Sequence, residues 1–427
     1  MAKANGDHHL QSFPRHMQHT AAVGEIHSRP LPVLKAGSVI LHYAFMSEGG
    51  SSVARSNFAE LCNQRGVAGP EKSTRYHELA WGRGCLRWEA HSEFTTFTYD
   101  GPGPVRFGGD VANHPFGSNF AAPGSLISAC RVEVRSLTPA NRKLLERFDR
   151  DSLCVSLLGD DKSMLATDFR QDVNGMTVYL LLDGGLPEAR LGYYAKLAIE
   201  LETYRTLALL GLPLARTLSG KLSTAEVELS RLASAMRAAS SEENEKLLDE
   251  INTLAAELEA DAAASLFRFG ASRAYGAIVE DRIEVIGRRK LPDYMAIGTF
   301  INRSLRPALR TCISVEERQD NLSRKLARAA NLLRTRVDIE IESQNRDLLE
   351  SMNKRARMQL RLQQTVEGLS VAAVSYYVVG LFYYLAKALK KFLPGSVSPE
   401  MAAGMFVPVA VLLVWWLVRR IRKHHSE

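Results

Sequence analysis

The sequence predicts an α+β protein with a mixed-sheet α/β cytoplasmic domain, a long helical region and a C-terminal two-helix transmembrane hairpin. Three observations lead to this prediction. Between residues 36 and 183, short apolar or alternating segments typical of strands are mixed with helical segments. After Pro187 the pattern is helical throughout. Near the C-terminus, the runs 366–386 and 401–418 are apolar enough to cross a bilayer core, which needs about 20 residues.

These patterns divide the chain into eight segments. The predicted segments are a mobile N-terminal tail at 1–24, the α/β cytoplasmic domain at 25–186, a helical region at 187–314, a long stalk helix at 315–365, a first transmembrane helix at 366–386, a loop at 387–400, a second transmembrane helix at 401–418 and a basic tail at 419–427.

Within the α/β domain each predicted element has a local signal. Thr138 before Pro139 is typical of an N-cap followed by a first-turn proline, so a helix is expected from there to about residue 148. Proline, glycine and asparagine dominate 100–123, which predicts a loop. The remaining predicted elements are a helix at 58–65 and strands at 38–45, 85–99, 131–136, 153–158, 163–169 and 176–182.

The helical region has recognisable breaks. A first helix is predicted at 188–210, with Gly211 and Pro213 ending it, a second beginning at Thr224 and a third running from Ser241 to about 286. A loop is expected at 287–293, and Pro307 should break or kink the helix that follows.

From about residue 315 the chain has no proline or glycine until Gly368, which predicts one long helix that enters the membrane directly. It carries an apolar stripe at near-helical spacing. The stripe consists of Leu322, Leu326, Ala329, Leu333, Val337, Ile341, Leu348 and Met352. Such a stripe packs against neighbouring helices, and it can also form the seam of a homo-oligomer.

Aromatic and basic residues flank the two apolar runs. Tyr383 and Tyr384 lie near the end of the first run, and Trp415 and Trp416 lie just before the basic tail. Basic residues precede the first run and follow the second, although lysines also occur in the connecting loop. The positive-inside rule then predicts a two-span protein of the cell inner membrane with both termini in the cytoplasm.

Composition sets further limits. The chain of 427 residues is long enough for two or three domains, and its 46% hydrophobic and 24% charged residues are typical of folded proteins. Five scattered cysteines fit reduced thiols better than a disulfide framework or a zinc site. The net charge of +7 comes largely from the residues that flank the membrane runs, so the expected partner is a lipid bilayer and not nucleic acid.

Three segments, at 25–34, 86–99 and 359–385, resemble an uncharacterised family of bacterial proteins described as predicted membrane-anchored, the domain-of-unknown-function family 3422. The resemblance extends over essentially the whole chain. It implies membrane attachment and supplies no reaction, ligand or catalytic residue.

The predicted architecture is also similar to that of CorA-type divalent-cation channels, in which a long helix enters the membrane and a second span follows. That family ends its first span with a Gly-Met-Asn selectivity motif, whereas this chain reads FYYLAKALKK there. The basic loop would repel cations. The resemblance is therefore one of build, and it does not imply magnesium selectivity.

One strand pattern suggests a polar site. In the predicted strand 85–99, Arg87, Glu89, His91 and Glu93 would share one face, opposite Leu86, Trp88 and Phe94. Carboxylates and an imidazole can bind a divalent metal or exchange protons. A solvated sheet face with cross-strand ion pairs explains the same pattern and is the more common case.

Two other groups are weaker candidates. Glu25, His27 and Arg29 alternate in the same way and would join the first group if they lay beside it; an ordered extension explains them equally well. In the first span, Glu367, Ser370, Tyr377 and Tyr384 fall roughly on one helical face, as pore-lining residues would, although Glu367 lies close to the interface.

No enzyme signature is complete. The chain contains no Walker A loop, zinc-protease helix, nucleophile elbow or dinucleotide-binding glycine motif. We therefore expect no catalytic activity and no cofactor. The favoured hypothesis is a membrane-anchored scaffold or sensor, the alternative is an oligomeric CorA-like ion channel or transporter, and the least favoured is a metal-dependent enzyme that uses Glu89, His91 and Glu93.

Overall fold

The computed structural model describes residues 16–19, 23, 30–47, 51–72, 74–159, 161–289, 291–389 and 398–424. Most of the predicted tail at 1–24, and residues 390–397 of the predicted loop, lie outside this range. The chain divides into two compact units: unit 1 comprises residues up to 234 and 250–329, and unit 2 comprises 235–249 and 330–427. The α+β class is confirmed, with one mixed sheet, long helices and two apolar C-terminal helices.

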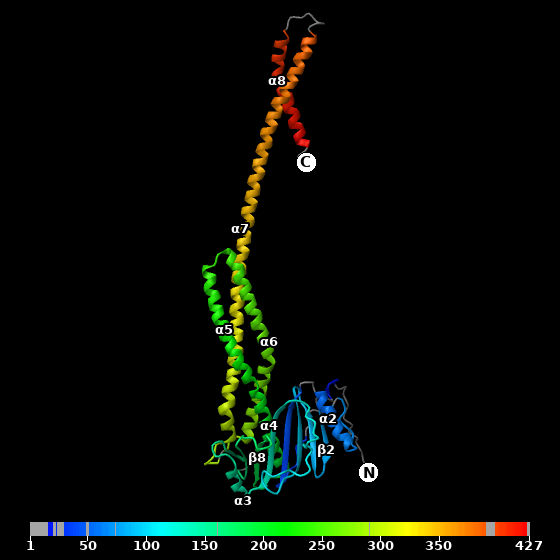
Figure 1. The fold of residues 1–427 in the computed structure, drawn as a ribbon, viewed down its shortest axis with the longest axis vertical. Helices are drawn as coiled ribbons and strands as arrows, with labels where there is room; N and C mark the ends of the chain where they lie inside the picture. The colour runs from blue at the N-terminus through cyan, green and yellow to red at the C-terminus, as the bar shows by residue number, and fades with distance from the viewer. Residues whose placement is uncertain are drawn as a thin grey trace, which may run out of the picture. The chain divides into compact units, whose positions relative to one another are not determined.

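Unit 1 contains an eight-stranded sheet with the order β2-β3-β4-β1-β5-β8-β7-β6 (Figure 1). All neighbouring strands are antiparallel except β5 and β8, which are parallel. The strands are β1 (Ser38–Met46), β2 (Tyr76–Trp81), β3 (Gly84–Ala90), β4 (Phe94–Pro102), β5 (Leu126–Ser136), β6 (Cys154–Leu158), β7 (Ser163–Thr167) and β8 (Thr177–Asp183).

The helices account for most of the rest of the described chain. They are α2 (Ser51–Gln64), α3 (Pro139–Arg142), the 3-10 helix η1 (Lys143–Arg147), α4 (Glu188–Leu209), α5 (Gly211–Ala238), α6 (Ser241–Ile286), α7 (Ile297–Leu389) and α8 (Pro399–His424). Thr138 caps α3 as predicted, because its Oγ1 accepts a hydrogen bond of 3.1 Å from the Asn141 backbone N–H.

Both faces of the sheet are covered. On one face, residues of β1, β5 and β8 such as Ile40, Val132 and Leu181 pack against α4. On the other, Trp88 and Phe97 pack with Phe58 of α2 in an aromatic cluster. This two-sided burial explains why several strands are apolar along their whole length.

The prediction of one strand at 85–99 was wrong. The segment forms the hairpin of β3 and β4, with a turn at His91, Ser92 and Glu93. The turn reverses the chain, so Phe94 lies on the α4 side of the sheet, whereas Leu86 and Trp88 lie on the α2 side as predicted. Strand β2 was not predicted at all; among its residues only Leu79 is buried, so its sequence has little apolar pattern.

Two helix boundaries also differ from the prediction. Helix α4 ends at Leu209, but α5 begins at once at Gly211 and includes Thr224 in its interior. Pro213 fits because it lies in the first turn, where no intrahelical N–H donor is needed. Helix α7 begins at Ile297 and runs through Pro307 without ending.

The segment 30–35 crosses the start of α4 at very close range. The Leu34 backbone N–H donates a hydrogen bond of 3.2 Å to the Glu188 carbonyl. At Gly192, a Cβ atom would collide with the Pro32 carbonyl oxygen. Only glycine therefore allows this approach of the two backbones.

The outer edge of β6 is occupied by the segment that leads into α7. The Val155 N–H donates to the Met295 carbonyl at 2.9 Å, and the Leu157 N–H donates to the Arg289 carbonyl at 2.9 Å. The outward-facing backbone donors of this edge strand are thus already paired.

Unit 2 contains the later part of α7 and helix α8, which form the predicted hairpin. The rings of Phe382 and Phe406 stack with centroids 4.1 Å apart, so the two helices are in contact. Small residues are buried between them, namely Ser375 of α7 and Ala403 and Ala410 of α8. Small side chains at such positions let two helices approach closely.

Candidate functional site

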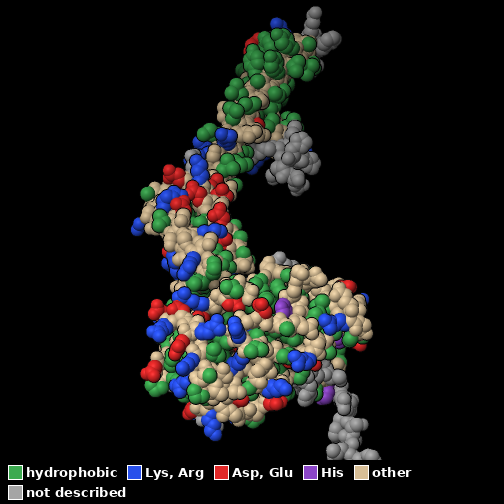
Figure 2. Space-filling view, turned by 60° about the horizontal axis from the view of Figure 1, so that its bottom comes forward, with side chains coloured by type: hydrophobic (Ala, Val, Ile, Leu, Met, Phe, Trp, Pro, Cys, Tyr) green, Lys and Arg blue, Asp and Glu red, His purple; other side chains and the backbone are tan. Residues whose placement is uncertain are grey.

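Two helices are long and apolar enough to cross a membrane: α7, in its C-terminal part, and residues Pro399–Arg420 of α8. In the most apolar 18-residue stretch of each helix, only 6% and 17% are buried, respectively. The hydrophobic side chains there are therefore largely exposed and do not form the core of a soluble unit. Figure 2 shows hydrophobic side chains covering most of this hairpin, with lysine and arginine side chains gathered next to it.

Aromatic and basic side chains contact one another at the ends of these helices. The guanidinium groups of Arg419 and Arg420 lie 5.0 and 5.2 Å from the ring centroids of Trp415 and Trp416. Pairs of this kind are typical of the membrane–water interface, where the ring is half apolar and the cation stays hydrated.

The three residues suggested as pore candidates remain on one side of α7. The Ser370 hydroxyl donates to the Val366 carbonyl at 2.8 Å, so the helix backbone uses it. Tyr377 is 70% exposed and contacts Tyr376 edge-on, while Glu367 is half-buried. Within a single chain, these three side chains do not form a site together.

The strand candidates Glu89, His91 and Glu93 are separated by the β3–β4 turn. His91 stacks on Phe94, with centroids 4.1 Å apart and planes inclined by 7°. Its Nε2 lies 4.0 Å from a Glu89 carboxylate oxygen. Both carboxylate oxygens of Glu93 instead accept hydrogen bonds from Arg268 of α6, at 3.2 and 2.7 Å.

The structure brings together no metal-ligand set in the part of the chain that it describes: no group of three or more His, Cys, Asp or Glu side chains there could hold an ion. Glu25, His27 and Arg29 lie outside the described residues. Arg87 forms cross-strand ion pairs with Glu78, at 2.8 Å, and with Asp100. The side chains of Arg87 and Asp100 are only 13% and 16% exposed, so this second pair is largely withdrawn from water.

Sequence reasoning missed a buried polar cluster between the sheet and α4. The two ring nitrogens of His42 hydrogen-bond Thr98 at 2.8 Å and Thr203 at 3.0 Å, and Thr203 also contacts Ser128 at 3.1 Å. Complete burial lowers the pKa of His42 from its usual 6.5 to about 3, so the ring is neutral at physiological pH. A cavity of only about 40 Å³ adjoins the cluster, enough for a water molecule and not for a substrate.

A second buried group lies beside it. The Glu202 carboxylate accepts hydrogen bonds from Thr177 at 3.0 Å, from Tyr179 at 2.9 Å and from Arg205 at 2.6 and 3.0 Å. Every acceptor position is used, which is typical of a structural network. The sequence contained a signal for both clusters. His42 lies in an apolar strand, and Glu202 and Thr203 lie in an apolar helix.

The cysteines are free thiols, and none looks reactive. Burial raises the pKa of Cys85 to about 11 and of Cys154 to about 12, and it also raises the pKa of Cys62, Cys130 and Cys312.

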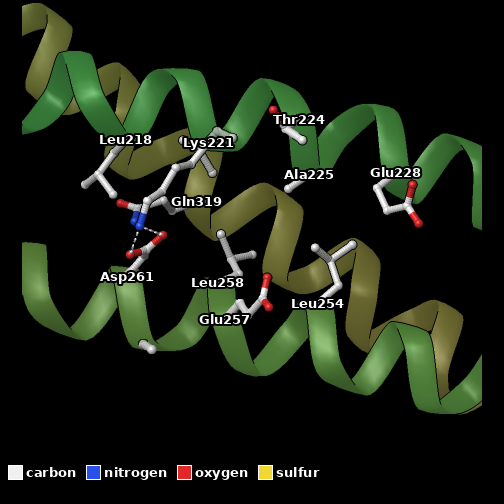
Figure 3. Close-up of a pocket in the computed structure, with 12 residues that line it drawn as sticks. Leu218, Lys221, Thr224, Ala225, Glu228, Leu254, Glu257, Leu258, Asp261 and Gln319 are labelled. Atoms are coloured by element: carbon white, nitrogen blue, oxygen red, sulfur yellow. Dashed lines mark hydrogen bonds and ion pairs between the residues drawn. The ribbon is translucent and has the colours of Figure 1, made fainter.

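A groove of about 680 Å³ lies between helices α5, α6 and α7 of unit 1. We call it the interhelical groove. Its walls are mostly aliphatic, with Leu218 and Leu222 from α5 and Leu254 and Leu258 from α6 (Figure 3). Gln319 of α7 also lines it. This volume is in the range of pockets that bind small organic molecules.

Ion pairs link the two walls of the groove. The Lys221 Nζ donates to both carboxylate oxygens of Asp261, at 2.7 and 2.9 Å. Arg231 and Glu250 connect the same two helices farther along. Figure 3 shows Lys221, Asp261 and Gln319 gathered at one end of the groove and Glu228 and Leu254 toward the other. Helices α5 and α6 are thus joined at intervals along the groove.

Comparison with known proteins gives one result. A family model described as "Protein of unknown function (DUF3422)" matches residues 14–425. No match was found among curated proteins.

Proposed function

The chain belongs to the DUF3422 family of proteins of unknown function, and from its structure we propose a non-catalytic, membrane-anchored scaffold or sensor. In this proposal the hairpin of α7 and α8 crosses the cell inner membrane twice, with both chain termini in the cytoplasm. The α/β domain and the helices α4 to α6 then work on the cytoplasmic side. No metal or cofactor takes part.

The observation that carries this proposal is the continuity of α7. One helix of 93 residues contributes buried side chains such as Leu322 and Leu326 to the helical part of unit 1 and ends in a candidate membrane span. A flexible linker would have been sufficient to tether a domain. A continuous helix can transmit a conformational change from the soluble part to the membrane spans, or from the spans to the soluble part.

The apolar stripe of α7 supports self-association of the stalk. Its early members are buried, with Leu333 completely covered. Its later members Ile341, Leu348 and Met352 are 49%, 60% and 58% exposed in the single chain. Together with Leu362 they occupy four of the seven a and d positions of one heptad frame between 341 and 362, the other three being Asn345, Arg355 and Gln359. The same helix of a second copy can cover the four apolar positions.

The mass of the purified protein tests whether the stalk part of α7 self-associates. The full-length protein, purified in detergent, should have the mass of a dimer or a larger ring by light scattering. Leu348→Lys should shift it to the monomer, because it replaces an apolar contact of the seam with a second charge that would lose its water. Ile339→Lys is the matched control: Ile339 is 62% exposed and lies off the seam.

A monomeric wild-type protein would overturn the self-association, and so would equal behaviour of the two lysine variants. Membrane attachment is independent of this result and has its own test in the Discussion.

One observation favours the channel alternative. Glu367 is half-buried at the start of the span, with Ser370 and Tyr377 on the same side of the helix, and an ionisable residue in a span is often functional. Liposome flux of divalent cations, measured with wild type, Glu367→Gln and Glu400→Gln as control, tests it. Flux that depends on Glu367 supports a conduit, and no flux above protein-free liposomes excludes it.

A further inference from the structure

Neither the anchor nor the stalk explains the interhelical groove of unit 1. It lies within a folded helical bundle, and cross-helix ion pairs join its walls. Leu218, Leu222 and Leu258 are only 3%, 2% and 6% exposed, so the floor is rigidly packed and the shape of the groove is set in advance.

A second observation points to a ligand. The Gln319 side chain is 4% exposed, and its Nε2 amide group has no hydrogen-bond acceptor among the described residues. The Ser265 hydroxyl lies 3.5 Å from its Oε1 but already donates its hydrogen to the Asp261 carbonyl at 2.9 Å. A buried donor without an acceptor is destabilising, so an acceptor supplied from the groove would be favourable.

The charged side chains that line the groove restrict which ligand head groups it can bind. The groove is lined by the carboxylates of Glu228, Glu257 and Asp261 and by the ammonium group of Lys221, which pairs with Asp261. Arg231 pairs with Glu228 at 2.7 Å, so the excess negative charge is that of Glu257. This excess of negative charge disfavours fatty acids and other anions. An ammonium head group would be attracted, but it has no lone pair with which to accept the Gln319 amide hydrogen.

We propose that the interhelical groove binds a neutral single-chain amphiphile, an alkyl chain that ends in a hydroxyl or carbonyl group such as a monoacylglycerol. The alkyl chain lies along Leu222, Leu254 and Leu258, between α5 and α6. The oxygen of the head group accepts a hydrogen bond from Gln319 Nε2.

Lys221 controls access to that donor. Its side chain is 58% exposed, whereas that of Asp261 is 29% exposed, so the lysine is the partner that can swing into solvent. When it moves, the Asp261 end of the groove opens toward Gln319. Binding would thereby exchange an ion pair at the surface, which contributes little, for a buried hydrogen bond.

The proposal goes beyond the anchored scaffold and does not depend on it. It is tested with full-length protein in lipid nanodiscs by titration calorimetry with three probes of equal chain length, namely monooctanoylglycerol, octanoate and octylamine. Empty nanodiscs measure partitioning into lipid, which is subtracted. Wild type should bind monooctanoylglycerol at one saturable site at least about tenfold more tightly than the two charged probes.

Variants assign the site. Ala225→Trp and Ala260→Trp, which fill the groove from α5 and from α6, should each reduce the affinity for monooctanoylglycerol at least about tenfold. Val227→Trp is the matched control, because Val227 is 71% exposed and does not line the groove. Gln319→Leu should remove the preference for monooctanoylglycerol over octylamine while binding of the alkyl chain remains.

Two results would overturn the proposal: no saturable binding above empty nanodiscs, or binding that the groove-filling variants leave intact. Equal affinities of wild type for the three probes would reject the neutral head group. A monoacylglycerol with a photoreactive diazirine chain maps the position directly, and crosslinks outside 218–228, 254–261 and 319 would also reject the groove. Circular dichroism of each variant verifies folding.

Discussion

Arg268 of α6 holds Glu93 of the β3–β4 turn with both ends of its guanidinium group. Nη1 donates to Oε1 at 3.2 Å, and Nη2 donates to Oε2 at 2.7 Å. The two side chains are 20% and 9% exposed, so the pair is largely withdrawn from water. The carboxylate that the sequence suggested as a metal ligand therefore fastens a turn of the sheet to a helix 175 residues away.

Removing this carboxylate should destabilise unit 1. We expect Glu93→Gln to lower the free energy of unfolding by about 2–3 kcal/mol, because the Arg268 cation stays buried without its partner. Glu284→Gln is the control, since Glu284 near the end of α6 pairs with Arg288 just beyond it; both side chains are more than half exposed, and the loss should be less than about 0.5 kcal/mol. Urea titration of the full-length protein measures both; equal losses would contradict the expectation.

Acid should destabilise the protein through His42. Its pKa is about 3 when folded and 6.5 when exposed, so below pH 6.5 the unfolded chain binds a proton that the folded chain does not. Stability should fall between pH 6.5 and 3 by at most about 1.4 kcal/mol per pH unit from this residue.

His42→Gln should flatten that part of the profile. Thr98→Val removes a hydrogen-bond partner of the ring but keeps the titrating group, so its profile should retain the wild-type slope even if it lies lower. Urea unfolding at half-unit steps of pH compares the three proteins. Identical slopes for wild type and His42→Gln would show that burial of this histidine does not shape the acid response.

Two of the helical glycines of unit 1, Gly192 and Gly220, have different surroundings and give a paired test. Gly192→Ala should destabilise by about 1–3 kcal/mol, because the new methyl group meets the Pro32 carbonyl. Gly220→Ala in α5 should stabilise by about 0.5–1 kcal/mol, since open space surrounds the position and alanine favours the helix. Melting temperatures that move in the same direction would refute the close approach at Gly192.

Deleting residues 366–427 should release the protein from membranes. Full-length protein is expected to remain in the pellet after alkaline carbonate extraction, whereas the truncated chain should move to the supernatant. A green fluorescent protein fused to the C-terminus should fluoresce and an alkaline phosphatase fused there should be inactive. The opposite pair of results would place the C-terminus outside the cytoplasm.

Much of the fold could be predicted because its signals are local. Strand β1, helix α6 and the cap at Thr138 all follow from patterns within a few residues. The turn at His91–Glu93 could not be predicted, because its residues continue the alternation of β3 and contain no glycine or proline. The start of α5 was predicted too late because Pro213 was taken to follow the end of a helix. A proline is equally common in the first turn of the next helix, which is where Pro213 lies.

The candidate sites were less predictable because they depend on distant partners. The pattern around Glu93 suggested a metal ligand, and only the folded chain brings Arg268 to it. His42 is paired with Thr203, which is 161 residues away. The interhelical groove is likewise a property of three helices together: each contributes ordinary leucines and alanines, and nothing in any one of them indicates that a gap is left between them.

The paired outer edge of β6 affects how membrane-anchored copies of the protein can interact. Anchoring confines copies of a protein to two dimensions and raises their local concentration, which favours unwanted contacts. A sheet with an open edge would then recruit strands from its neighbours. Because Arg289 and Met295 already accept the outward hydrogen bonds of β6, the chain can be crowded without polymerising through that side of its sheet.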